Sequence, residues 1–162
     1  MPKLATCLWF DSQAEEAAKF YTSIFKNSKI LSISHYTEAG HETHKRPAGS
    51  VMTAVFEIEG YTITALNGGP QFKFTEAASL EVHCKDQAEI DYYWEKLQAG
   101  GGQPGPCGWL KDKYGLSWQV FPVQLNEYVQ DKDKQKASRA MEAMLKMSKI
   151  DLAAIQRAYE GK

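Results

Sequence analysis

Gln119 lies in a short stretch of the chain whose residue types could line a binding site. Just before it, Asp112 and Gly115 stand three positions apart. This spacing suits a tight turn that needs a side-chain acceptor and a residue at positive φ. In the strand that follows, alternation places one set of side chains on one face and a second set, which includes Gln119, on the other: Leu116, Trp118 and Val120 against Ser117, Gln119 and Phe121. A polar side chain inside a strand either meets solvent or points into a cavity, and we predict the cavity for Gln119.

Three cysteines could carry thiol chemistry. Cys107 stands beside Gly108 and Trp109, but a catalytic thiol needs a lowered pKa, and no histidine is near it in the sequence. We favour a buried apolar role for Cys107 over a nucleophile, and we predict core positions for Cys7 and Cys84. An odd number of widely separated cysteines does not predict a disulfide framework.

The histidines give a weaker signal. His41 and His44 have the spacing of a metal-binding pair, yet they lie in a polar stretch with only Glu38 and Glu42 nearby. A loop without a metal is the favoured interpretation. His83, near the end of a predicted strand, is interpreted as a structural histidine, with acid–base work as the alternative.

Aromatic residues and a glycine turn are further candidates for ligand contacts. Phe72 and Phe74 stand two apart on an extended segment between two halves of the chain, where they could contact a ligand or a second subunit. Asn67 begins an Asn-Gly-Gly-Pro sequence and could point into the same cavity. A turn between the two halves explains that sequence at least as well. The glycines at 100–102 follow a helix, so they do not form a nucleotide loop.

Composition excludes several classes of protein. The chain has 162 residues, 43% hydrophobic content and a formal net charge of −1. Such a charge attracts neither nucleic acid nor an anionic membrane. No run of about 18 apolar residues is present, and the first residues lack a signal-peptide core, so we expect a cytoplasmic protein.

The order of predicted elements repeats. The first half reads as a strand, a helix and three further strands, at residues 4–10, 13–25, 29–36, 51–58 and 61–66, with an exposed, mobile loop at 38–48. The second half restarts with a strand at 79–84, a helix at 87–99, and two or three short strands through Pro122. Two amphipathic helices follow, and they could pack on their own module or on a partner subunit.

Several short sequences in this order resemble the PhnB-like group. These are Leu8-Trp9-Phe10-Asp11, Leu66-Asn67-Gly68-Gly69-Pro70, Cys107-Gly108-Trp109-Leu110, Gly115-Leu116-Ser117-Trp118-Gln119 and Pro122. The group is often labelled 3-demethylubiquinone-9 3-methyltransferase-like. It is similar to the vicinal-oxygen-chelate superfamily, which includes glyoxalase I, extradiol dioxygenases and bleomycin-resistance proteins.

The resemblance implies an α+β vicinal-oxygen-chelate fold. Two βαβββ modules, at about 4–70 and 77–122, would form a curved mixed sheet around a cavity within a domain at 1–122. A C-terminal helical tail would occupy 123–162. The resemblance also implies a homodimer.

Metal-dependent members of the superfamily carry ligands on the first and last strands of each module. Carried onto this chain, those positions are Thr6, Ser79, Thr64 or Ala65, and Gln119. A divalent metal is usually held by imidazole, thiolate or carboxylate groups, and none of these residues supplies one. We therefore predict no metal and no cofactor.

Two functions remain open. The first is a metal-independent binding protein for a small aromatic or apolar molecule, without nucleic-acid or membrane partners. The second is an enzyme of the glyoxalase/dioxygenase type, or the methyltransferase that the family label names. No glycine-rich strand-to-helix turn for an adenosyl cofactor supports the methyltransferase. The predicted ligand-binding residues are Thr6, Asn67, Phe72, Phe74, Ser79, Cys107, Trp109 and Gln119.

Overall fold

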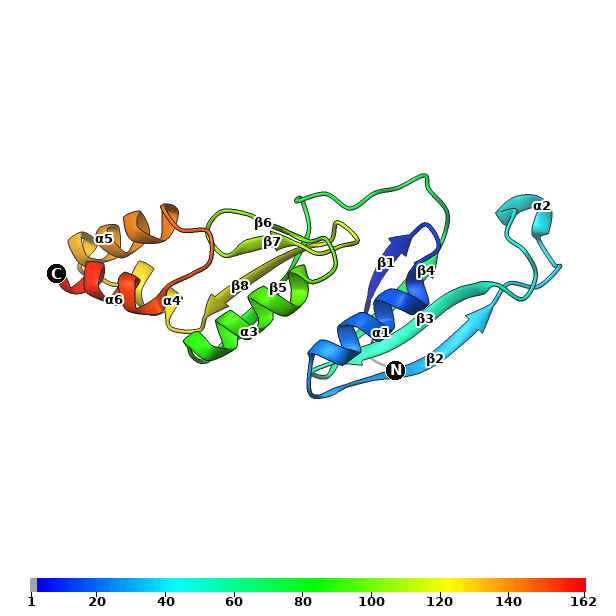
Figure 1. Cartoon of the computed structure of the whole chain (residues 1–162), viewed down its shortest axis with the longest axis horizontal. Coiled ribbons are helices and arrows are strands. Elements are labelled where there is room, and N and C mark those ends of the chain that lie inside the picture. The colour runs from blue at the N-terminus through cyan, green and yellow to red at the C-terminus, as the bar shows by residue number, and fades with distance from the viewer. Residues whose placement is uncertain (1–2) are drawn as a thin grey trace. The chain divides into compact units, whose positions relative to one another are not determined.

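The computed structural model describes residues 3–162, which divide after Lys73 into two compact units (Figure 1). Each unit contains one open, mixed, four-stranded sheet with a helix on one face. The α+β prediction is therefore confirmed, and so is the repeated order of elements.

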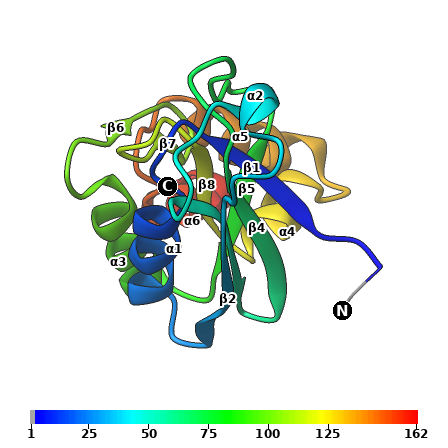
Figure 2. The same ribbon diagram turned by 90° about the vertical axis from the view of Figure 1, so that its right-hand side faces the viewer.

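The first unit is built around a sheet with the strand order β1-β4-β3-β2. Its elements are β1 (Thr6–Phe10), α1 (Ala14–Ile24), β2 (Ser28–His35), α2 (His41–His44), β3 (Val51–Ile58) and β4 (Tyr61–Asn67). Strand β1 is parallel to β4, and the other pairs are antiparallel. Helix α1 lies against one face of the sheet (Figure 2), where Tyr21, Phe56 and Ile63 are almost completely buried. This burial of apolar side chains is what holds helix and sheet together.

The second unit repeats this arrangement with the strand order β5-β8-β7-β6. Its first elements are β5 (Ser79–Cys84), α3 (Gln87–Gln98), β6 (Gln103–Pro104), β7 (Trp109–Lys111) and β8 (Ser117–Pro122). Strand β5 is parallel to β8, and β7 is antiparallel to both β8 and β6. Helix α3 covers the face that carries Leu110, Trp118 and Val120, all of which are buried. The opposite face of this sheet is called the helix-free face below.

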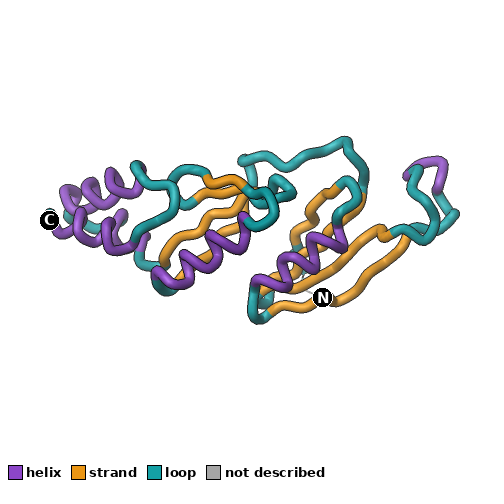
Figure 3. Tube along the Cα trace, viewed as in Figure 1, coloured by secondary structure: helices purple, strands orange, loops and turns teal. Residues whose placement is uncertain are grey.

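The C-terminal tail is helical and belongs to the second unit (Figure 3). It comprises α4 (Leu125–Val129), α5 (Lys134–Leu145) and α6 (Leu152–Glu160). Gln87 on α3 joins the tail to the module: its Nε2 donates to the oxygen of Ile150 at 3.0 Å, and its Oε1 accepts from Leu152 N at 2.9 Å. Ile150 is fully buried, so the tail packs on its own module. The sequence predicts either Ser148 or Asp151 as the cap of α6, and in the structure Asp151 is the cap, with its side chain accepting the Ala154 N–H.

Two local predictions need correction. The segment at 38–48 is not entirely loop, because one helical turn, α2, forms between Gly40 and Lys45. The sequence at 11–13 also predicts a side-chain cap for α1, but the N-cap residue, Gln13, makes no such hydrogen bond. Instead, Asn67, which is 53 positions away, accepts the Ala14 N–H at 2.8 Å. Among residues 3–162, no helix is long and apolar enough to cross a membrane.

Candidate binding site

The hairpin between β7 and β8 is fixed by Asp112, which is only 3% exposed. Its Oδ1 accepts the N–H groups of Tyr114 and Leu116 at 2.9 and 3.1 Å, and its Oδ2 accepts the Trp118 indole N–H at 2.9 Å. Gly115 has a φ of +84°. The predicted turn is confirmed, and it sets the register of the two strands that carry Gln119 and Trp109.

Two rows of side chains cross the helix-free face of the second sheet. Residues that lie opposite each other on neighbouring strands form the rows, and alternation puts both rows on one face. The first row is Ser79, Ser117 and Lys111, and the second is Glu81, Gln119 and Trp109. The rows are linked, because Gln119 Nε2 donates to Ser79 Oγ at 2.9 Å. The structure thus brings together three residues predicted from sequence: Ser79, Trp109 and Gln119.

A cavity of about 470 Å³ adjoins these rows. This volume lies in the range of small-molecule sites, roughly 300–1,000 Å³. All of the lining residues belong to the second unit: Glu76, Gln103, Pro104, Gly105, Pro106, Trp109, Leu110, Lys111 and Ser117.

Ser117 stands out among the lining residues because it is 1% exposed and its hydroxyl has no hydrogen-bond partner. Within residues 3–162, only Gln124 has another buried side-chain polar atom in this condition. Buried hydroxyls are normally paired, since an unpaired one costs about 1–3 kcal/mol. Ser117 is thus a cavity-lining residue whose hydroxyl has no partner within the protein.

Lys111 supplies the positive charge of the cavity. Its Nζ lies 2.5 Å from Glu76 Oε1, and both side chains are substantially exposed, at 41% and 62%. The Lys111 ammonium group, which donates a hydrogen bond to Glu76, lowers the pKa of that carboxyl. An exposed pair of this kind contributes little to stability and can exchange partners readily.

The rim of the cavity is held in place by the tail. Ser148 Oγ donates to the oxygen of Gly105 at 2.7 Å. The N–H groups of Cys107 and Gly108 donate to the oxygens of Met147 and Ser148 at 2.8 and 2.7 Å. The Gly105–Gly108 loop that borders the cavity thus rests on the segment between α5 and α6.

Asn67 has a structural place in the first unit. Its side chain is nearly buried, at 6% exposed. In addition to the bond from Ala14, its Nδ2 donates to the oxygen of Val51 at 3.0 Å. Both ends of the amide are therefore engaged at the start of α1, and contact between Asn67 and a ligand stays a prediction.

Thr6 lies on the face of the first sheet that packs on α1. It stands opposite Ile63, and its Oγ1 lies 2.5 Å from the hydroxyl of Tyr61. Its ligand-binding role also stays a prediction.

The glycine turn after Asn67 packs closely on Trp9. A Cβ added to Gly68 would lie 2.1 Å from the Trp9 ring, and the Trp9 indole donates to the oxygen of Gly69 at 2.8 Å. Phe72 meets Trp9 edge to face at 5.0 Å while remaining 66% exposed. Phe74 begins the second unit and is not among the residues that line the cavity. For both phenylalanines, contact with a ligand stays a prediction.

The three cysteines have different environments. The prediction for Cys84 is confirmed: it is buried, and burial, followed by the charges of Glu89 and Asp86, raises its pKa to about 12. The prediction for Cys7 is wrong, because Cys7 is exposed. It lies on the sheet face opposite α1, beside Thr64, and partial desolvation raises its pKa. Cys107 is half-buried at a φ of +54°, within the loop held by the tail.

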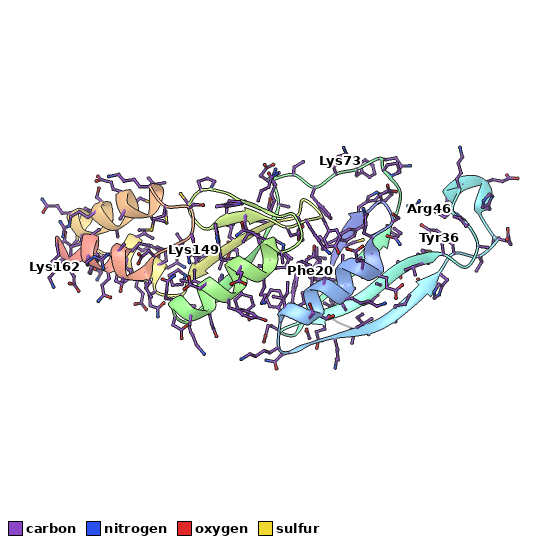
Figure 4. All side chains as sticks on the ribbon, in the orientation of Figure 1. Phe20, Tyr36, Arg46, Lys73, Lys149 and Lys162 are labelled. Carbon is purple, nitrogen blue, oxygen red and sulfur yellow. The ribbon has the colours of Figure 1, made fainter. Side chains whose placement is uncertain are left out.

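The histidines interact with their immediate neighbours. His44 Nδ1 accepts the Arg46 N–H at 3.0 Å, and its ring lies 4.5 Å from that of Tyr36. Tyr36 precedes α2 in the sequence and Arg46 follows it; both are labelled in Figure 4. His83 is exposed and lies 2.9 Å from Glu81 Oε2. Across residues 3–162, no three His, Cys, Asp or Glu side chains are grouped to hold a metal ion. Metal independence itself stays a prediction.

Sequence reasoning missed Glu76, Lys111 and Ser117 as candidate site residues. Strand alternation correctly predicts that Ser117 shares a face with Gln119. A small polar residue next to a turn is not expected to be buried, so the sequence did not single out Ser117 as a site residue. Lys111 precedes that turn by one residue, so pairing the two strands of the hairpin would have placed it opposite Ser117. Glu76 carried no signal, because only the folded chain brings it to Lys111.

The paired sheet-and-helix units place the chain in the vicinal-oxygen-chelate superfamily. A family model described as 3-demethylubiquinone-9 3-methyltransferase matches residues 2–121. The chain belongs to this family, and the resemblance to the PhnB-like group is confirmed. Among the curated proteins, no match is found.

Solved structures agree with this assignment. A PhnB protein from Bacillus cereus, described as a candidate 3-demethylubiquinone-9 3-methyltransferase, is 37% identical; the match covers 75% of this chain and all of that one, with a TM-score of 0.64. Protein PA1353 from Pseudomonas aeruginosa is 16% identical over 75% and 98% of the two chains, with a TM-score of 0.59. The fosfomycin resistance protein FosX from Mesorhizobium loti is 14% identical over 81% and 100%, with a TM-score of 0.56. The last two show the fold alone.

Proposed function

We propose that this protein is a metal-independent binding protein for a small aromatic molecule, and that the site is the cavity of the second unit. The observation that carries the proposal is the buried, unpaired hydroxyl of Ser117 on the cavity wall. A ligand acceptor or donor that pairs with this hydroxyl removes the cost of leaving it unsatisfied.

The rest of the lining suits an aromatic ligand. Trp109 offers a large flat surface, and Pro104, Pro106 and Leu110 supply further apolar area. Binding sites of this size are mostly apolar, with a few polar groups that fix the orientation of the ligand. Here Ser117 and Lys111 are those groups, and Gln119 supports them from the next row by its bond to Ser79.

Metal independence is supported by the donor chemistry of the positions carried over from metal-dependent relatives. Thr6, Ser79 and Gln119 offer neutral hydroxyl and amide groups. Divalent ions in proteins are usually held by imidazole, thiolate or carboxylate groups.

Thermal unfolding of the full chain with aromatic probes tests the proposal. 1-Naphthol, 2-naphthol and 1,4-naphthoquinone are suitable probes. Saturating ligand at about 100 times its Kd should stabilise the protein by about 2.7 kcal/mol and raise the Tm. Ser117→Ala should reduce this shift, and the matched control Ser138→Ala, on exposed helix α5, should retain it. Unchanged Tm with every probe, or equal shifts for both variants, would contradict the proposal.

The family description favours a second candidate, transfer of a methyl group to a demethylubiquinone. The connections that lead from β1 into α1, at 11–13, and from β5 into α3, at 85–86, contain no glycine, although glycine-rich connections of this kind hold cofactor phosphates in other folds. Calorimetry with S-adenosylmethionine separates the two candidates: measurable binding would favour the enzyme.

We also propose a homodimer, as the family resemblance implies. Native mass spectrometry at micromolar concentration is the test. Twice the mass of the 18.2 kDa chain would support the dimer, and a monomer mass would refute it.

A further inference from the structure

One row on the helix-free face of the second sheet is unusually rich in hydrogen-bond donors. Ser79, Ser117 and Lys111 lie opposite one another on β5, β8 and β7. Neighbouring strands are about 4.8 Å apart, so the row spans about 10 Å from β5 to β7. Ser117 is at its centre, and the long side chain of Lys111 can reach toward it.

Within residues 3–162, the two hydroxyl groups of this row have no acceptor, and its one cation has a single carboxylate partner. Ser79 Oγ already accepts a hydrogen bond from Gln119, so its own O–H is free to donate in another direction. The Ser117 hydroxyl has no partner at all. The Lys111 ammonium has three N–H groups, and Glu76 is its ion-pair partner. A ligand group that complements this row must accept hydrogen bonds. It should also carry a negative charge, because the Lys111 ammonium group is positive.

Glu76 shows that a carboxylate fits on Lys111, since its Oε1 lies 2.5 Å from the ammonium nitrogen. Glu76 lies in a turn before β5, outside any helix or strand, and its side chain is 62% exposed. If it leaves Lys111, it becomes hydrated at little cost. The other carboxylate of this face, Glu81, is paired with His83 on its own strand and stands one row away from Lys111.

We propose that the cavity selects small aromatic carboxylic acids, whose carboxylate replaces Glu76 on Lys111 and accepts the hydroxyl of Ser117. The ring of the acid then lies toward Trp109, one row further along the same face. This inference rests on the proposed function, because it uses the same cavity and names the class of ligand. A charge-assisted hydrogen bond in a site of this kind is stronger than a neutral one.

Matched acids and amides test the inference directly. Benzoate, 1-naphthoate and 2-naphthoate are titrated into the full chain by calorimetry, each beside its neutral amide of nearly equal shape. We expect at least one acid to bind about tenfold more tightly than its amide, a difference of about 1.4 kcal/mol, because a hydrogen bond to a charged group is stronger than one between neutral groups. Lys111→Gln should abolish this preference. The control Lys113→Gln removes an equal charge from an exposed position on the same hairpin and should preserve it.

The outcomes separate this inference from the function on which it rests. Equal affinity of acids and amides, or an acid preference that survives Lys111→Gln, would overturn the selectivity for acids and leave an aromatic binding protein. If no acid, amide or naphthol bound the folded chain, both proposals would be overturned. A further check is Glu76→Gln, which removes the internal competitor and should raise affinity for the acids.

Discussion

The two units of this protein share an order of elements but use their buried polar groups differently. In the first unit, Asn67 is buried with both ends of its amide bonded, to Ala14 and Val51. In the second, Ser117 is buried more deeply, and its hydroxyl has no partner. The first unit thus satisfies Asn67 internally, whereas the second satisfies Asp112 in its hairpin and leaves Ser117 on the cavity lining without a partner. In a repeated fold, the unsatisfied copy is the better candidate for a ligand site.

The cysteines give the largest measurable contrast between the units. At pH 8, Cys84 should react with iodoacetamide on the order of a thousandfold more slowly than a free thiol, because a pKa of about 12 leaves almost no thiolate. Cys7 is exposed and should react faster than Cys84. Peptide mass spectrometry after timed labelling measures both rates. Equal rates would contradict the assigned burial.

The raised pKa of Cys84 also predicts a pH dependence of stability. The unfolded thiol loses its proton near pH 9, whereas the folded thiol keeps its proton up to about pH 12. The contribution of this group to stability is therefore complete below pH 9 and falls as the pH rises from 9 toward 12. Urea unfolding of Cys84→Ala over this range should show a weaker decline than that of the native chain.

Asn67→Ala tests the structural role of the polar group in the first unit. It should lower the free energy of unfolding by about 2 kcal/mol, because it leaves the Ala14 N–H and the Val51 oxygen without their partner. Asn67→Asp is the matched control. It keeps an acceptor at the start of α1 but loses the donor to Val51, so the loss should be smaller. Urea unfolding measures both, and a loss below about 0.5 kcal/mol for Asn67→Ala would contradict the structural role.

Ser117→Ala tests the opposite case in the second unit. It should raise the free energy of unfolding by about 1 kcal/mol, because it removes a buried hydroxyl that has no partner. The same change should weaken binding of the aromatic acids. Urea unfolding measures the expected gain in the free energy of unfolding, and calorimetry measures the expected loss of affinity for the acids. A less stable variant would show that the hydroxyl is already satisfied.

Ser148→Ala tests whether the tail supports the cavity. Loss of the bond to Gly105 should loosen the rim and weaken acid binding about threefold, which corresponds to a hydrogen bond worth about 0.7 kcal/mol. Ser138→Ala, on α5 away from the rim, is the control. If the two variants bound the acids with the same affinity, the bond from Ser148 to Gly105 would contribute to folding but not to ligand binding.

Local turn and strand chemistry explains why much of the fold could be predicted. The Asp112–Gly115 turn follows from two residues three positions apart, and the repeated order of elements follows from hydrophobic periodicity. Cys7 was assigned wrongly because a short apolar run does not reveal which of its faces is exposed. The cap of α1 could not be predicted from the local sequence either, because Asn67 supplies it from 53 residues away.

The candidate site was predictable only in part for the same reason. Gln119, Ser79 and Trp109 could be named because alternation and the family resemblance point to one face of the second module. The unpaired state of Ser117 and the contact between Glu76 and Lys111 depend on tertiary packing. Neither leaves a pattern in the sequence.

Chemical-shift mapping by NMR compares the two units most directly. The ¹⁵N-labelled chain is titrated with 2-naphthoate, and the amide and indole signals of both units are followed together. We predict the largest shifts at Gly105, the Trp109 indole, Lys111 and Ser117, around the cavity of the second unit. Shifts confined to Trp9, Asn67 and Gly68 in the first unit would contradict the assignment of the binding site.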